Sequence, residues 1–225
     1  MYIFGIIITG YCPVNMDEKP MLYLNTISIL PKEFFLNPDV VEVSRLLLGK
    51  ILVSQVDGKV TAGRIVETEA YDGTIDRACH AFPNKITKRT EVMFAEGGRS
   101  YIYLCYGIHH LVNVVTGPEH SPKAVLIRAL EPVEGLDFMR ERRGPVVDRL
   151  LTNGPGKLAE ALGVKLLHND KELYHNNGII FIAEEANNKK VNITVSNRIG
   201  VAYAKEDAFL PWRFYISKNP YISQN

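Results

Sequence analysis

The chain has 225 residues, of which 46% are hydrophobic and 23% charged, enough apolar material for one well-buried domain. The formal net charge is +1, so bulk charge does not by itself indicate a nucleic-acid partner. Three unevenly spaced cysteines (Cys12, Cys79 and Cys105) and six histidines without ligand spacing argue against a disulfide framework or a metal. We therefore expect a reducing, cytoplasmic location, no metal and no cofactor.

The N-terminal residues 1–29 contain a short apolar run at 3–8. The run is too short to cross a bilayer and lacks the positive flank of a secretory signal, so we expect no membrane association. Met16 and Met21 offer later start positions. We predict that 1–29 is a flexible or mis-assigned extension ahead of one domain over 30–225. The alternative is that the run at 3–8 packs on the domain as an added strand.

Local signals predict the first elements of the domain. The Asn-Pro pair at 37–38 is typical of a helix N-cap and first helical position, and Gly49 predicts the end of that helix. The Asp-Gly pair at 57–58 predicts a two-residue hairpin turn between strands over 51–56 and 64–71.

The rest of the chain alternates short strand-like and helix-like segments. Residues 72–100 are polar and contain glycine, which predicts a long surface loop with at most a short helix. Strands are expected over 101–105, 110–116, 123–130, 179–183, 191–195, 198–202 and 212–217, and helices after Pro132 to about Arg143 and over 157–162. This pattern indicates an α+β fold, a single compact domain with a curved, mostly antiparallel sheet and few helices.

The strand over 64–71 carries two carboxylates and an aromatic ring on one face. Side chains alternate along a strand, so Ile65, Glu67, Glu69 and Tyr71 are expected to point together. Glutamate is depleted in strands, so two of them among hydrophobic neighbours need a reason. A solvated sheet face is one explanation and a functional pair of carboxylates is the other.

The segment 101–107 (YIYLCYG) is a tyrosine-rich strand that ends at a glycine. Tyr101 and Tyr103 share a face, and Tyr106 lies beside the turn that Gly107 permits, where a side chain can protrude. Core packing is the expected role of Tyr101. The segment as a whole suits a stacking platform, because bases stack on aromatic faces for roughly 1–3 kcal/mol each.

Basic residues gather in two places. Lys85, Lys88, Arg89 and Arg99 lie between the two motif strands, and four arginines lie within 140–149. Solvated charge is the simpler explanation for both clusters, and more so for the second, where acidic neighbours can pair with the arginines along a helix.

Several motifs occur in a fixed order along the chain. They are 67–71 (ETEAY), His80, 89–94 (RTEVMF), 101–107 (YIYLCYG), 111–113 (LVN), 124–132 (AVLIRALEP), 153–158 (NGPGKL) and 213–215 (RFY). Together they resemble the alkyladenine (3-methyladenine, methylpurine) DNA glycosylase family. The resemblance runs from about Leu30 to the C-terminus and implies an antiparallel sheet that carries a protruding hairpin.

The resemblance implies an activity on double-stranded DNA that contains damaged purines. The enzyme, acting as a monomer, would extrude the purine and remove it by hydrolysis, with Glu69 as general base and Arg128 holding that carboxylate or the water. A structural ion pair with Glu67 is the alternative role of Arg128. No lysine stands where a Schiff base would be expected, so no strand-cleaving lyase step is expected.

The resemblance also assigns the DNA contacts. Tyr106 would fill the space that the extruded nucleotide leaves. Asn113 would exclude guanine by clashing with its exocyclic amine, although a plain strand-end hydrogen bond explains it equally well. The base pocket would consist of Tyr71, His80, Met93, Tyr103, Asn113, Ala124 and Leu126, and phosphates would bind Lys85, Lys88 and Arg89.

Two other functions fit part of this pattern. A nuclease could use Glu67 and Glu69 to hold Mg²⁺, but would need more carboxylates nearby. A single-strand binding module could stack bases on Tyr71, Tyr101 and Tyr103, but the two glutamates on that face would repel phosphate.

Overall fold

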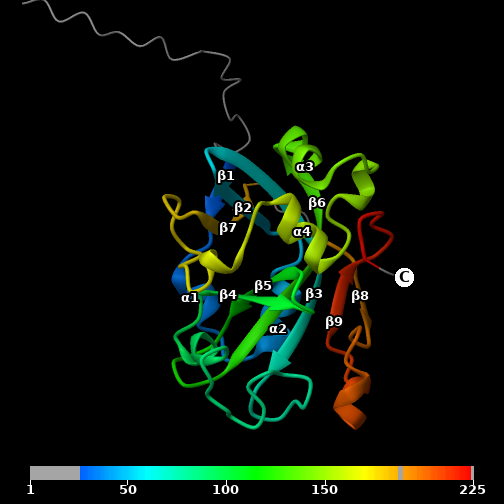
Figure 1. Ribbon diagram of the computed structural model, residues 1–225. Coiled ribbons are helices and arrows are strands. Elements are labelled where there is room, and N and C mark those ends of the chain that lie inside the picture. Colours follow the sequence, from blue (N-terminus) through cyan, green and yellow to red (C-terminus); the bar gives the residue numbers. More distant parts are fainter. Residues whose placement is uncertain (1–25, 187–189, 224–225) are drawn as a thin grey trace, which may run out of the picture.

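The computed structural model describes residues 26–186 and 190–223, which form one antiparallel sheet with few helices (Figure 1). The predicted α+β class is therefore confirmed. Most of the predicted N-terminal extension, residues 1–25, lies outside the described residues. The strands are β1 (Ile27–Ile29), β2 (Ile51–Val56), β3 (Lys59–Asp72), β4 (Ser100–Cys105), β5 (His109–Val115), β6 (Lys123–Glu134), β7 (Ile180–Glu185), β8 (Ile193–Ser196) and β9 (Arg213–Ile216).

The strand order is β1-β7-β2-β3-β6-β5-β4. Strand β9 pairs with the second half of β3, at Glu67 to Glu69, and β8 pairs with β9. The helices are α1 (Lys32–Phe35), α2 (Val40–Leu46), α3 (Leu136–Arg143) and α4 (Pro155–Ala161). The two longest strands, β3 and β6, pair along almost their whole length and run through the middle of the molecule (Figure 1). They position most of the side chains of the candidate site.

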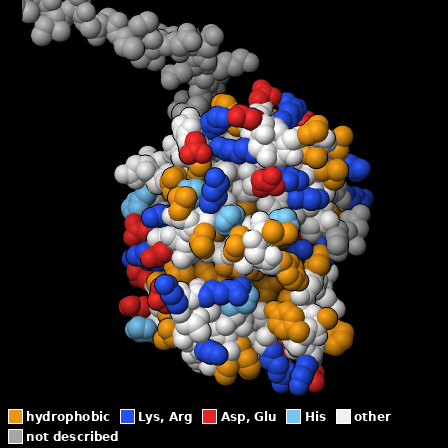
Figure 2. Space-filling model, in the orientation of Figure 1, with side chains coloured by type: hydrophobic (Ala, Val, Ile, Leu, Met, Phe, Trp, Pro, Cys, Tyr) orange, Lys and Arg blue, Asp and Glu red, His pale blue; other side chains and the backbone are white. Residues whose placement is uncertain are grey.

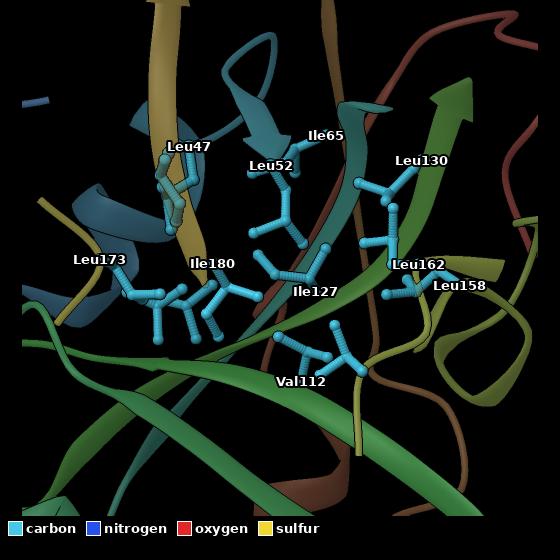
Figure 3. Close-up of a cluster of buried hydrophobic side chains, with 14 of the residues drawn as sticks. Leu47, Leu52, Ile65, Val112, Ile127, Leu130, Leu158, Leu162, Leu173 and Ile180 are labelled. Carbon is cyan, nitrogen blue, oxygen red and sulfur yellow. The ribbon is translucent and has the colours of Figure 1, made fainter. Parts of the chain in front are cut away.

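The main hydrophobic core joins one face of this sheet to the helices. Figure 3 shows leucine, isoleucine and valine side chains meeting in one cluster, whose members include Leu47, Leu52, Val112, Ile127 and Leu158. Each is buried, and burial of such a side chain contributes about 1.5–3 kcal/mol. This core fixes the sheet against which the site is built.

The predicted hairpin at 57–58 is confirmed. Asp57 and Gly58 have φ values of 56° and 70°, the left-handed conformation that a tight hairpin turn requires at both central positions. The turn pairs β2 with the first half of β3.

A β-bulge breaks the alternation of side chains in β3. Ile65 pairs with Leu130 and Glu67 pairs with Ala129, so Val66 has no partner of its own on β6. As a result Ile65 lies in the main core together with Ala70. The prediction that Ile65 shares a face with Glu67, Glu69 and Tyr71 was wrong, because bulges re-aim the side chains on one side of them.

Three further boundaries differ from the predictions. Helix α2 is capped by Asp39, whose carboxylate accepts from the N–H groups of Val41 and Glu42, whereas Asn37 accepts from the N–H of Asp39. Strand β6 continues through Pro132 to Glu134, so α3 starts later than expected. Residues 198–202 are not a strand but lead into the 3-10 helix Ala202–Phe209.

Strand β1 was not predicted from the sequence. Its three residues pair with β7 through Ile27–Glu185, Ser28–Glu184 and Ile29–Ala183, so the end of the predicted extension belongs to the sheet. The loop after β3 contains only turns and the short 3-10 helix Glu91–Phe94, as expected.

Candidate active site

A cavity of about 600 Å³ opens beside the β4–β5 hairpin. Figure 2 shows a hollow lined by hydrophobic side chains near the middle of the molecule, with Lys, Arg and His side chains at its edge. The strands β3 to β6, the loop after β3 and the segment after β8 all contribute to the wall. Ten residues that the sequence pointed to line it: Tyr71, His80, Arg89, Met93, Tyr103, Tyr106, Asn113, Ala124, Leu126 and Arg128.

Glu69 is fully buried directly behind this wall. Its Oε2 accepts from the hydroxyl of Tyr71 at 2.7 Å and from Nη1 of Arg128 at 3.2 Å, and its Oε1 accepts from the backbone N–H of Ile199 at 2.7 Å. All three donors line the cavity. Burial and the neighbouring Glu69 charge raise the pKa of Tyr71 well above its ordinary value, so its hydroxyl stays protonated and donates.

Glu67 is buried as deeply but is held by more donors. Its carboxylate accepts from Nε of Arg128 at 3.2 Å and from Nε of Arg213 at 2.7 Å. Ser223 adds its backbone N–H at 2.6 Å and its hydroxyl at 2.9 Å. The solvated sheet face considered for the two glutamates is therefore wrong, since both are enclosed and paired with arginine.

Arg128 joins the two carboxylates. It lies on β6 at a second irregularity, because Glu67 pairs with Ala129 and Thr68 pairs with Ile127. The contacts that both roles predicted for Arg128 require, one with Glu69 and one with Glu67, occur in one network.

Aromatic side chains form two walls of the cavity. Tyr103 packs against Tyr101 with the ring centroids 5.4 Å apart, and Tyr71 comes from β3. The guanidinium of Arg198 lies 4.7 Å from the centre of the Tyr71 ring and is bonded to the carboxylate of Asp76, with Nη2 to Oδ1 at 2.8 Å. Arg198 therefore fixes Tyr71.

His80 has a partner on each ring nitrogen. Its Nδ1 lies 2.8 Å from the hydroxyl of Tyr101, and its Nε2 lies 3.0 Å from Nη2 of Arg89. Because a guanidinium only donates, Nε2 must accept, which places the single proton of the neutral ring on Nδ1. Burial, with a contribution from Arg89, lowers the pKa of His80 to about 4, so the ring is neutral near pH 7.

Asn113 has a fixed orientation in the wall. Its side-chain amide donates to the carbonyl oxygen of Tyr101 at 2.9 Å, across the β4–β5 pair. This is the plain hydrogen bond considered from the sequence. The side chain nevertheless lines the cavity, so the bond also fixes its orientation in the cavity wall.

Tyr106 stands at the tip of the hairpin with 92% of its surface exposed. Tyr106 and Gly107 have φ values of 51° and 74°, and the N–H of Ile108 donates to the carbonyl oxygen of Cys105 at 3.1 Å. A left-handed backbone is uncommon for an aromatic residue, and it holds this ring away from the body of the protein.

The three basic residues predicted to bind phosphate separate into two groups. Lys85 and Lys88 are exposed and lie outside the cavity wall. Arg89 is also exposed but lines the cavity, with its guanidinium 4.6 Å from the centre of the Tyr103 ring.

Sequence reasoning missed the part of the wall after β8, namely Ile199, Gly200, Val201 and Tyr203. Ile199 acts through a backbone N–H, which leaves no mark in the residue type. The incorrect strand prediction over 198–202 also hid this segment.

The described residues contain neither a cluster of metal ligands nor a helix that could span a membrane. Within 26–186 and 190–223, no group of three or more His, Cys, Asp or Glu side chains is placed to hold a metal ion. None of the helices in those ranges is long and apolar enough to cross a membrane.

Comparisons with known proteins agree on one family. Residues 33–220 match the family model described as Methylpurine-DNA glycosylase (MPG). Proteins of Chlamydia pneumoniae and Chlamydia felis are 46% and 48% identical over 193 residues, 84% of this chain and 95% and 96% of theirs. A protein of Clostridium botulinum is 45% identical over 204 residues, 87% of this chain and 99% of its own. Each bears the name "Putative 3-methyladenine DNA glycosylase".

Proposed function

From the premise that this chain belongs to the methylpurine-DNA glycosylase family, we propose that it removes damaged purines from duplex DNA by hydrolysis, with Glu69 as general base. The substrates are alkylated or deaminated purines of the 3-methyladenine, 7-methylguanine, hypoxanthine and ethenoadenine type. The product is an abasic site.

The observation that carries this proposal is the difference between the two buried carboxylates. A carboxylate has about four lone-pair sites. Among the described residues Glu67 accepts four hydrogen bonds and Glu69 accepts three. On each carboxylate one oxygen, Oε2 of Glu67 and Oε1 of Glu69, accepts a single one of these bonds, so the two differ in position rather than in capacity. All three donors to Glu69 line the cavity, whereas of the described donors to Glu67 only Arg128 does. Glu69 is therefore the carboxylate that a water molecule in the cavity can reach.

Water reaches Glu69 most easily on the side of Arg128. The contact between Arg128 and Glu69 is 3.2 Å, long for a charge-assisted hydrogen bond, which is usually about 2.7–2.9 Å. The other two contacts of Glu69 are 2.7 Å. A small shift of Arg128, which lines the cavity, admits a water that bonds to both side chains.

The chemical step follows from this placement. Glu69 accepts a proton from the water molecule as the water oxygen attacks C1′ of the sugar. The bond between C1′ and the purine nitrogen breaks, and its electron pair leaves with the purine. The buried negative charge of Glu69 also stabilises the positive charge that develops on the sugar, as carboxylates do in glycoside hydrolysis.

The cavity gives the extruded base its surroundings. Tyr106 enters the duplex at the vacated position, which offsets part of the few kcal/mol that extrusion costs. Tyr71 and Tyr103 stack on the base, and Asn113, oriented by Tyr101, disfavours the exocyclic amine of guanine. 7-Methylguanine has the same amine but is still removed, because its positive charge weakens the bond to the sugar.

The absence of a nucleophilic amine supports a glycosylase without lyase activity. No lysine lines the cavity among the described residues, so a Schiff base with the sugar has no donor. We further propose that the protein acts as a monomer and that Lys85 and Lys88 contact phosphates beside the cavity.

One assay tests this function against both alternatives. The protein is incubated in EDTA with duplexes that contain hypoxanthine or ethenoadenine, and the products are treated with alkali. Strand breaks that appear only after alkali support the proposal. Metal-dependent cutting without alkali would identify a nuclease, and retardation without cutting would identify a binding module.

A further inference from the structure

The two tyrosine walls of the cavity each carry a guanidinium. Arg198 lies 4.7 Å from the centre of the Tyr71 ring, and Arg89 lies 4.6 Å from the centre of the Tyr103 ring. The arginines differ in how their charges are compensated. Arg198 is paired with the buried carboxylate of Asp76, whereas Arg89 has no ion pair among the described residues.

Arg89 is nevertheless held in place. Its Nη2 donates to Nε2 of His80 at 3.0 Å while its guanidinium packs on Tyr103. The ring of His80 lies 4.7 Å from the Tyr103 ring in an edge-to-face arrangement, and its Nδ1 is bonded to Tyr101. Arg89 thus belongs to the same group of side chains that a bound base would contact.

The charges around the cavity do not cancel. Among the described residues, its wall contains two charged side chains, Arg89 and Arg128. Arg128 and Arg213 together balance the two carboxylates of Glu67 and Glu69, which leaves the charge of Arg89 uncompensated. The Arg89 side chain is exposed, but its guanidinium lies against the Tyr103 ring of the cavity wall, and charges near a protein surface interact more strongly than they would in bulk water.

Damaged purines fall into two charge classes. Purines alkylated at N3 or N7 carry a positive charge while they are attached to the sugar, whereas hypoxanthine and ethenoadenine are neutral. The face of a tyrosine ring attracts a cation. The Tyr103 ring already makes this cation–π contact with the guanidinium of Arg89. A cationic purine therefore loses part of the attraction that it would otherwise have to Tyr103 and is repelled by the guanidinium, whereas a neutral purine is not repelled.

We propose that Arg89 is a specificity-determining residue that favours neutral damaged purines over positively charged ones. The inference rests on the proposed function. It also gives Arg89 a role other than the phosphate contact expected from the sequence.

The test compares single-turnover excision of 7-methylguanine and hypoxanthine from duplexes of the same sequence. Arg89→Gln removes the charge and should raise the ratio of the 7-methylguanine rate to the hypoxanthine rate by about five- to tenfold. Arg89→Lys keeps the charge and should leave the ratio within about twofold of the unmodified protein. Lys88→Gln makes the same charge change on an exposed neighbour outside the cavity wall and should leave the ratio unchanged.

The outcomes separate the two levels of inference. An Arg89→Gln protein that loses both rates by the same factor, as Lys88→Gln would, identifies Arg89 as a phosphate contact and overturns the specificity role. Excision of neither purine by the unmodified protein would refute the proposed function itself. Equal melting temperatures for all four proteins confirm that the ratios compare folded molecules.

Discussion

Ser223 donates both its backbone N–H and its hydroxyl to the buried carboxylate of Glu67, at 2.6 and 2.9 Å. This serine lies beyond residues 33–220, the part of the chain that matches the family model. Glu67 in turn accepts from Arg128, which contacts Glu69. A residue outside the matched region therefore supports Glu69, the carboxylate proposed to activate water, indirectly through Glu67 and Arg128.

Ser223→Ala should slow single-turnover excision about three- to tenfold without weakening binding of lesion duplex. The reason is that Glu67 loses one of its four donors and positions Arg128 less firmly. Ser223→Thr keeps a hydroxyl and should restore most of the rate. Ser217→Ala is the matched control, because the Ser217 hydroxyl bonds to Thr194 instead. If both alanine variants slow excision equally, the effect belongs to the general stability of this segment.

Glu69→Gln should reduce excision by a factor of about 100 to 10,000, the range for loss of a general base. It should keep lesion binding, because the amide preserves shape. Glu67→Gln should instead lower the free energy of unfolding by roughly 3 kcal/mol, since it removes the negative charge that two buried arginines, Arg128 and Arg213, contact. Single-turnover rates and thermal melting measure the two effects. Near-normal excision by Glu69→Gln would move the general base elsewhere, with Glu67 the next candidate.

Tyr106→Ala should slow excision from fully paired DNA more than from a mispaired or single-stranded lesion, because only the first requires a filled gap. The melting temperature should not change, since the ring is 92% exposed. Phe209→Ala removes another exposed aromatic ring, outside the cavity wall, and should leave all these rates unchanged. Equal losses on every substrate would contradict insertion into the duplex.

The sequence predicted much of the sheet because turn chemistry and hydrophobic runs are local signals. The Asp-Gly turn at 57–58 and the strands on either side of it are an example. The bulge beside Val66 could not be predicted, because it depends on how β3 pairs with β6, strands far apart in the chain. The face assigned to Ile65 was wrong for the same reason.

The candidate site shows the same division. Motif residues such as Tyr71, Tyr103 and Asn113 converge on one cavity, as the resemblance implied. The Ile199 N–H that holds Glu69 could not be inferred, because every residue except proline supplies that group. The place of Arg89 on Tyr103 depends on the course of the loop after β3, for which the sequence has no periodic signal.

Replacement of both Lys85 and Lys88 by glutamine should weaken DNA binding regardless of the lesion. Each phosphate contact contributes about 0.9 to the slope of log affinity against log salt concentration, so the slope should fall by about 1.8. Lys171 and Lys218 are exposed lysines outside the cavity wall, and their double replacement serves as the control. An equal change in slope for both pairs would indicate non-specific attraction rather than contacts beside the cavity.

The stability of the protein should depend on pH through His80. Its pKa is lowered from 6.5 to about 4 in the folded state, mainly by burial. Between these values the unfolded state binds more protons, so stability is fully present above pH 6.5 and is lost as the pH falls towards 4. At about 1.4 kcal/mol for each pKa unit, and with a reduction for partial exposure, the loss should be about 2 kcal/mol.

His80→Asn should therefore flatten the fall in unfolding free energy between pH 6.5 and 4, measured by denaturant titration at several pH values. His120→Asn replaces an exposed histidine and should keep the full pH dependence. Between pH 6.5 and 8, where His80 remains neutral, its hydrogen bond from Arg89 should persist, and the ratio of 7-methylguanine to hypoxanthine excision should stay constant. A His80→Asn protein with an unchanged pH slope would show that other groups cause the acid sensitivity.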